Sequence, residues 1–325
     1  MKRRAFITLL GGAAAAWPLA ARAQQNLASI GFLGAGAVET SAPLLEAVKQ
    51  GLRENGLLEG KDYVLKPRWA EGHYERFAEY ARELVEQDVR VMIVTTIAAA
   101  RAAQRATSAI PIVMASINDP VGNGIVASLA RPGGNTTGMA TLNQDVTTKL
   151  LEFTNALFPN AASIAVLFNP TNPSNPVYFE SVRVQAVSHG IAVQDFAVNT
   201  PSELNSRFDA IAAKRPDALL VIPDAATQDL GIRIAALSLQ NRIAVISTDP
   251  ELTTAGGLIS YGVSRRENYR RSAYFVKKVL EGVKPADLPV EQPTRILLSV
   301  NLKTAKTLGL IVPQNLLVAA DELVE

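Results

Sequence analysis

The chain has 325 residues, of which 48% are hydrophobic and 19% are charged, and it contains no cysteine. A chain of this length and composition is expected to fold into two lobes, each with its own buried core. The lack of cysteine excludes disulfides, thiolate catalysis and thiolate metal sites.

The N-terminus has the features of an export signal over residues 1–23. Residues 2–4 are basic, residues 5–19 are apolar, and residues 21–23 place alanine at both positions that specify cleavage. The apolar stretch is too short to span a bilayer comfortably, which disfavours a membrane anchor. The pair Arg3-Arg4 also resembles a twin-arginine signal, so both export routes stay open. We expect cleavage after Ala23 and a mature protein in the periplasm.

Removal of this leader changes the charge of the protein. The leader carries four of the 32 basic residues and none of the 30 acidic ones, so the formal net charge of +2 becomes −2. No basic surface then remains to indicate nucleic-acid binding. No cysteine follows the cleavage site to carry a lipid, which predicts a protein free in the periplasm.

In the first half of the mature chain, short apolar runs alternate with amphipathic stretches. The runs predict strands at 28–33, 63–69, 91–94 and 110–115. The stretches between them predict helices whose apolar faces include Leu44 to Leu52, Phe77 to Val85, and 97–108. This alternation is typical of a doubly wound parallel sheet.

A turn-rich break at 130–135, followed by residues 136–141, separates this half from a second set of alternating elements. Further strands are predicted at 164–168, 191–196, 218–222 and 243–247. Helices are predicted at 146–157 and 176–188, from a capping-box pattern at 200–203, and from 222 to about 239.

The tail is less regular and predicts a hinge. It contains a strand ending at 262, a helix face from Tyr269 to Leu280, a proline-paced linker at 284–290 and a last strand at 295–300. The predicted fold class is therefore α/β, with two doubly wound parallel-sheet lobes joined by several crossings. We expect residues 24–143 plus about 257–289 in lobe 1, and residues 144–256 plus about 290–325 in lobe 2.

Several segments resemble signatures of the ABC-transporter substrate-binding protein family that includes tryptophan-binding importer components. The matching segments are 110–113, 118–121, 128–138 (SLARPGGNTTG), 285–294 (PADLPVEQPT), 301–310 (NLKTAKTLGL) and 320–322. The resemblance implies a type I periplasmic-binding fold that closes on a solute, with an ABC permease of the inner membrane as its partner. It also favours an amino acid or an aromatic carboxylate as the ligand.

Candidate ligand-binding residues follow the predicted strands, because ligands of open α/β sheets settle outside the carboxyl ends of the strands. In lobe 1 these are Gly36, Thr95, Thr96 and Asn118. The two threonines precede a helix whose N-terminus can hold a carboxylate, but an ordinary N-cap explains them equally well. Asn118 can donate to a ligand oxygen or form an Asx-turn, and we favour the turn.

In lobe 2 the same reasoning selects Asn169, Asp224, Asp249 and Tyr261. A carboxylate such as Asp224 suits an α-amino group, although each polar residue can instead cap the next helix. Tyr261 can stack on a planar ligand or pack in the hinge, and we favour packing.

Other functional classes find little support in the sequence. The chain has only His73 and His189, and the usual hydrolase, nucleotide-binding and zinc-protease motifs are absent from the sequence. We therefore expect no enzyme activity, cofactor, metal or nucleic-acid partner, and a monomer. A periplasmic sensing module that presents its ligand to a membrane receptor would use the same fold, and it remains the alternative.

Overall fold

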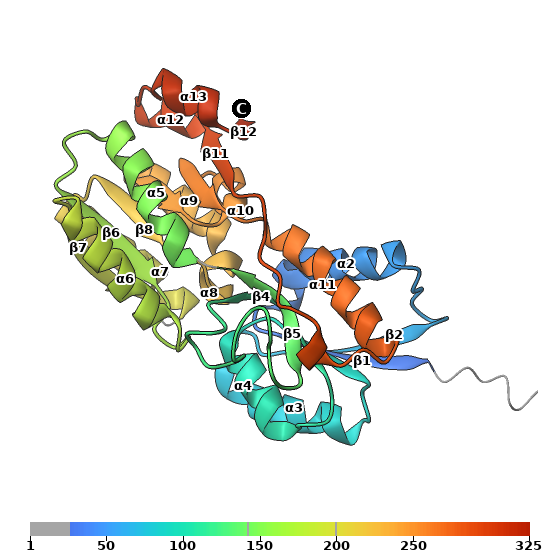
Figure 1. Ribbon diagram of the computed structural model, residues 1–325. Coiled ribbons are helices and arrows are strands. Elements are labelled where there is room, and N and C mark those ends of the chain that lie inside the picture. Colours follow the sequence, from blue (N-terminus) through green and yellow to red (C-terminus); the bar gives the residue numbers. More distant parts are fainter. Residues whose placement is uncertain (1–26, 142, 199) are drawn as a thin grey trace, which may run out of the picture.

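The computed structural model describes residues 27–141, 143–198 and 200–325, arranged as two lobes with a sheet in each (Figure 1). The predicted leader, 1–23, lies outside the described residues. The α/β class and the two lobes predicted from the sequence are confirmed.

The first lobe is built on a parallel sheet in the order β2-β1-β3-β4-β5. Its strands are β1 (Ala28–Gly34), β2 (Tyr63–Trp69), β3 (Val91–Val94), β4 (Ile112–Asn118) and β5 (Thr136–Thr141). All four residues of β3 are buried, as expected for the middle of a sheet covered on both faces. Gly138 in β5 has φ 127°, and a side chain there would collide with the backbone of Met114 in β4. The close approach of two strands therefore explains this glycine of the 128–138 segment.

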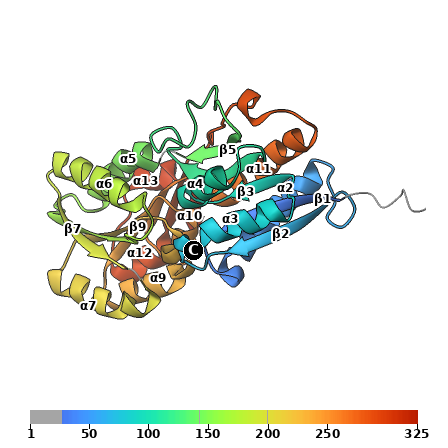
Figure 2. The same cartoon turned by 90° about the horizontal axis from the view of Figure 1, so that it is seen from below.

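Helices cover both faces of the first sheet. They are α2 (Val38–Glu54), α3 (Phe77–Glu86), α4 (Ile97–Ala106) and α11 (Arg265–Leu280), with the short 3₁₀ helices η2 (Tyr74–Arg76) and η4 (Pro285–Asp287). One core lies between the sheet and α3 and α4, and the other between the sheet and α2 and α11 (Figure 2). Phe77 and Leu84 of α3 are fully buried in the first core, as their helical spacing predicts.

The second lobe has a sheet in the order β12-β11-β10-β9-β8-β6-β7. Its strands are β6 (Ser163–Phe168), β7 (Ala192–Ala197), β8 (Ala218–Val221), β9 (Ala244–Ser247), β10 (Ile259–Gly262), β11 (Leu297–Asn301) and β12 (Glu322–Val324). The sheet is parallel except that β10 and β11 run antiparallel. The predicted parallel sheet is confirmed apart from this pair, which is antiparallel because the chain leaves the lobe after β10 and re-enters from the opposite direction.

The helices of the second lobe are also divided between the two faces. They are α5 (Asn143–Leu157), α6 (Asn175–Ser188), α7 (Leu204–Lys214), α8 (Ala225–Asp229), α9 (Gly231–Gln240), α10 (Pro250–Thr254), α12 (Leu302–Leu308) and α13 (Gln314–Ala319), with η3 (Pro201–Glu203). Helices α5, α6, α12 and α13 pack into one core, and α7, α9 and α10 into the other.

The elements of the two lobes imply three passages of the chain between them. The first separates β5, which ends at Thr141 in the first lobe, from α5, which begins at Asn143 in the second. The second passage was expected near 257, but β10 pairs with β9 and β11, so it follows Gly262. The third was expected near 290, but Glu291 still bridges to Met139 of β5, so it lies at 292–296. Both passages lie later in the chain than expected because strand pairing, which sequence periodicity does not specify, keeps these segments in their lobes.

A few elements differ from the sequence-based expectations. The helix expected from 222 to 239 is two helices, α8 and α9, and the helix expected at 200–203 begins as the 3₁₀ turn η3 before α7. The elements α12, α13 and β12 lie beyond the last strand predicted from the sequence. No helix in the described part of the chain is long and apolar enough to cross a membrane.

Candidate ligand cleft between the lobes

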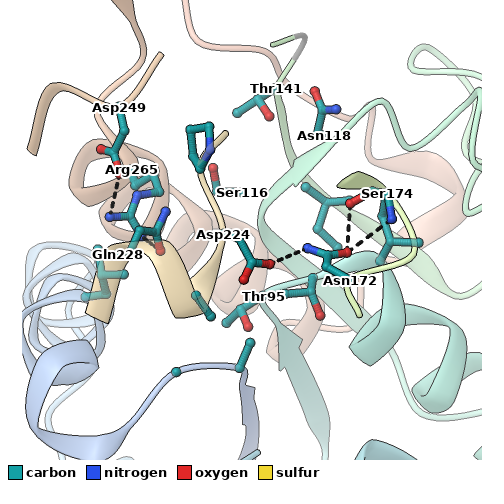
Figure 3. Close-up of a pocket in the computed structure, with 18 of the residues that line it drawn as sticks. Thr95, Ser116, Asn118, Thr141, Asn172, Ser174, Asp224, Gln228, Asp249 and Arg265 are labelled. Carbon is teal, nitrogen blue, oxygen red and sulfur yellow. Dashed lines mark hydrogen bonds and ion pairs between the residues drawn. The ribbon is translucent and has the colours of Figure 1, made fainter. Parts of the chain in front are cut away.

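The carboxyl ends of the parallel strands in both lobes face one another across a cleft (Figure 3). The cleft encloses about 1040 Å³, including open solvent at its mouth. The first lobe contributes the ends of β1 to β5, and the second contributes the loops that follow β6, β8 and β9. This is the position at which open α/β sheets bind ligands.

The N-terminus of α4 points a set of donors at the cleft. Thr96 is the N-cap, and its hydroxyl accepts a hydrogen bond of 3.1 Å from the Ala99 amide. The N–H groups of Ile97 and Ala98 lie in the first turn, where the helix itself supplies no acceptor. Together with the positive end of the helix dipole, they favour an anion at this end of the cleft.

A second helix of the first lobe, α2, is closed to such an anion by the other lobe. The N-cap of α2 is Ala37, which has no side chain able to cap. Its amide instead donates at 3.1 Å to Oδ2 of Asp229, at the end of α8, and Thr40 also donates to Asp229. An acidic side chain from lobe 2 therefore caps a helix of lobe 1. Gly36 lies next to this contact, and a Cβ there would collide with the Ser41 hydroxyl and approach Asp229 Oδ1 to 3.2 Å.

Aromatic rings form part of the first-lobe wall. Trp69, at the end of β2, lines the cleft and packs against Phe32 at 5.1 Å between ring centroids. Tyr178 and Tyr269 line it from other sides. Burial raises the pKa of Tyr269 above its ordinary value, so its hydroxyl stays neutral. A planar group can therefore find ring surface here while polar groups surround its other end.

The carboxylate of Asp224 is occupied by donors from the protein itself. Its Oδ1 accepts from the Asn169 amide side chain and the Ala226 N–H, both at 2.9 Å. Its Oδ2 accepts from Asn172 Nδ2 and from the Tyr74 hydroxyl, both at 2.6 Å. Burial, and then the charge of Asp224, raise the pKa of Tyr74, so the phenol remains the donor. Tyr74 belongs to lobe 1, and this bond therefore joins the lobes.

Arg265, which follows the second passage between the lobes, brings a positive charge to the cleft. The guanidinium of Arg265 bonds to the Gln228 side chain and, at 3.3 Å, to Asp249 (Figure 3). Burial disfavours the charge of Asp249, but Arg265 holds the pKa of this carboxyl below its ordinary value. Glu251 lies 3.7 Å from Arg265; burial and the neighbouring Asp249 raise its pKa. The cleft therefore contains a half-buried cation whose charge Asp249 neutralises.

Six of the eight candidate residues selected from the sequence line the cleft: Gly36, Thr95, Thr96, Asn118, Asp224 and Asp249. The capping interpretation holds as well for Thr96, Asp224 and Asp249, which are the N-caps of α4, α8 and α10. The residue after Asn118 forms a local turn bond, since Asp119 Oδ1 accepts from the Gly122 amide, three positions on, at 2.8 Å.

The other two candidates do not line the cleft. Asn169 is buried beneath it, where its side chain donates to Asp224 and accepts from Thr171. Tyr261 packs edge-on against Phe153 of α5 at 5.3 Å between centroids, as the packing interpretation predicted. It points to the helix layer because side chains alternate between the two faces of a strand.

Several residues that line the cleft or join its two lobes were not predicted from the sequence. Trp69 and Ser116 lie at the ends of predicted strands, and Arg265 closely follows one, so the strand-end rule could have found all three. Tyr74 and Asp229 follow no strand directly, and no sequence signal indicates their contacts with the opposite lobe.

In the described ranges, no three His, Cys, Asp or Glu side chains gather in a way that could hold a metal ion.

Comparison with known proteins agrees with this architecture. A family model described as ABC transporter substrate binding protein matches residues 40–324. A tyrosine-binding protein of Clostridioides difficile is 26% identical over 273 residues, which cover 82% of this chain and 78% of that protein. The resemblance drawn from the sequence motifs is confirmed.

Solved structures are similar over nearly the whole chain. A conserved domain protein from Vibrio cholerae superposes with a TM-score of 0.85 at 25% identity, covering 92% of this chain and all of that one. An ABC domain from Streptococcus pneumoniae in complex with L-Trp gives a TM-score of 0.83, with the same identity and coverage.

Proposed function

The chain belongs to the ABC transporter substrate-binding protein family, and from that premise we propose that it captures an aromatic L-amino acid between its lobes for uptake by an ABC importer. In this proposal the leader is removed, the mature protein works in the periplasm as a monomer, and the ligand is bound and released unchanged. A permease of the inner membrane is the partner that accepts it.

The observation that carries the proposal is the pairing of a helix N-terminus with an aromatic wall in one enclosed cleft. The first turn of α4, capped by Thr96, suits a carboxylate. Trp69 offers ring surface to a planar side chain in the same cleft. One amino acid with an aromatic side chain can use both features at once.

The neighbouring helix favours the same orientation of the ligand. The N-terminus of α2 already receives Asp229, so of these two helices only α4 has a terminus left for the ligand carboxylate. Asp224 is also unsuited to the α-ammonium, because two donors already occupy each of its oxygens. We therefore place the ammonium near Asp249, whose Oδ1 and Oδ2 each accept from one donor, the Glu251 N–H and Arg265, and so keep room for a second.

Two relatives support the choice of ligand class. One is described as a tyrosine-binding protein, and the other was solved in complex with L-Trp. Both ligands combine an α-carboxylate with a planar ring, which is the combination that the N-terminus of α4 and Trp69 would suit.

Binding of L-tyrosine and L-tryptophan to the mature protein, stripped of ligand carried through purification, tests the proposal. A ligand present at a hundredfold its Kd stabilises the protein by about 2.7 kcal/mol, which a thermal melt detects readily. L-Leucine tests the need for a ring, and the amide of L-tyrosine tests the need for the carboxylate. A folded protein that neither aromatic amino acid stabilises would contradict the proposal.

A further inference from the structure

A second hollow lies outside the ligand cleft, and three arginines surround it. Arg82 of α3 and Arg101 and Arg105 of α4 line this groove, and its floor includes Ala98 and Ala102. We call it the arginine groove. Arg82 and Arg101 donate to the backbone oxygens of Ala78 and Asn123. Over the part of the chain that the structure describes, none of the three pairs with a carboxylate, and the one acid lining the groove, Glu75, bonds to His73.

Both lobes contribute to the arginine groove. Its walls come mainly from α3 and α4 of lobe 1, but Pro173, between β6 and α6, reaches it from lobe 2. Tyr74 lines the groove and is also the residue whose hydroxyl bonds to Asp224 across the lobes. Separation of the lobes would therefore withdraw Pro173 from the groove and free the Tyr74 hydroxyl. The groove is complete only while the cleft is closed.

We propose that the arginine groove is a docking site for an acidic segment of the importer's membrane-embedded subunit, which recognises the closed, loaded protein there. An apolar floor surrounded by arginines, with a tyrosine at one side, has the composition of a protein interface. A small anion would instead need polar groups that are buried and converge on it. Three cations without carboxylate partners on a mature chain of net charge −2 fit an acidic partner.

The proposal rests on the importer function proposed above, and it adds a consequence. Since Tyr74 touches both the groove and Asp224, a segment that displaces its ring would weaken the bond between the lobes. Docking at the groove would thereby favour opening and release of the ligand towards the partner.

Photocrosslinking of the full-length chain in its source cells tests the docking site. We place p-benzoylphenylalanine at Ala78, an exposed residue lining the groove, or at Ile311, which is 90% exposed and lies between α12 and α13 of the second lobe. We expect an adduct with the transmembrane subunit of an ABC importer from position 78 and none from position 311. Charge reversal by Arg82→Glu with Arg105→Glu should reduce that adduct at least tenfold.

Arg90→Glu is the matched control, because Arg90 is an exposed arginine of the same lobe that does not line the groove. It should leave the adduct unchanged. In calorimetry, L-tyrosine and L-tryptophan should bind the double variant within about twofold of the unmodified protein, which shows that the cleft and the fold are intact. If neither amino acid binds the unmodified protein, the proposed function fails, whereas the crosslinks report on the groove alone.

Uptake of the bound amino acid in cells lacking the chromosomal copy provides the second measurement. It should fall at least tenfold with the double variant and stay unchanged with Arg90→Glu. An importer adduct that survives charge reversal, an adduct from position 311 only, a sensor receptor in place of the importer subunit, or unchanged uptake would each overturn the proposal.

Discussion

The hydroxyl of Tyr74, in the first lobe, donates a 2.6 Å hydrogen bond to Oδ2 of Asp224, in the second. The carboxylate that accepts it is buried and held by three donors of its own lobe. Closing the cleft therefore adds one donor to a carboxylate that is already fixed in place. A hydrogen bond to a charged group contributes about 1.5–3 kcal/mol.

Loss of this bond should weaken ligand binding without touching the ligand. We expect Tyr74→Phe to raise the Kd for the amino acid roughly tenfold, because each 1.4 kcal/mol removed from the closed state is a factor of ten. Calorimetry gives the Kd, and small-angle scattering gives the proportion of open molecules. Tyr80→Phe, in the neighbouring helix α3, is the control. Equal affinities for both variants would show that the bond does not help closure.

Removal of Asp224 itself should cost stability in the absence of any ligand. Asp224→Ala removes the N-cap of α8, which is worth about 1 kcal/mol, and leaves the buried Asn169 and Asn172 amides short of an acceptor. Each unsatisfied group costs about 1–3 kcal/mol. We expect the Tm of the unliganded protein to fall by roughly 6–12 °C. Asp195→Ala, at an exposed position of β7, should change it little. A Tm that Asp224→Ala leaves unchanged would show that the hydrogen bonds to this carboxylate do not stabilise the protein.

Trp69 allows the cleft to be observed directly. The sequence has two tryptophans, and the other, Trp17, belongs to the predicted leader, so the fluorescence of the mature protein comes from Trp69. Titration with L-tyrosine should change this emission. Trp69→Leu should raise the Kd for L-tyrosine about tenfold, since ring contacts contribute about 0.5–1.5 kcal/mol beyond the buried area. Phe179→Leu, which removes a stacked pair in the second lobe, should leave the Kd unaltered.

The raised pKa of Glu251 predicts a dependence of stability on pH. Burial and the charge of Asp249 raise this pKa above the ordinary value of 4.5, so the folded state holds the proton more tightly than the unfolded chain. The contribution of Glu251 is then fully present below about pH 4.5 and is lost as the pH rises through its folded pKa. Glu251→Gln should flatten the part of the Tm profile that declines between about pH 5 and 8. Identical profiles for the two proteins would contradict the shift.

Much of the fold was present in the sequence. Most strands of both sheets and most of their covering helices were predicted, because buried parallel strands are continuous apolar runs and their helices have one apolar face. The strand-end rule also brought six of eight candidate residues to one cleft, since parallel strands end at a common edge. The positions of strands, helices and strand ends depend on residues close together in the chain, so hydrophobic periodicity predicts them.

The tertiary structure decided which of those residues are still available to a ligand. Asp224 was a reasonable candidate for an ammonium, but its oxygens are taken by Asn169, Asn172, Ala226 and Tyr74. The contact between Tyr74 and Asp224 joins residues 150 positions apart, and that between Asp229 and Ala37 joins residues 192 apart. No periodicity or motif encodes such a pair, because it forms only when two separately folded lobes meet. The sequence by itself determined the lobes and the edge at which they bind, and the docking of one lobe on the other determined which polar groups remain free there.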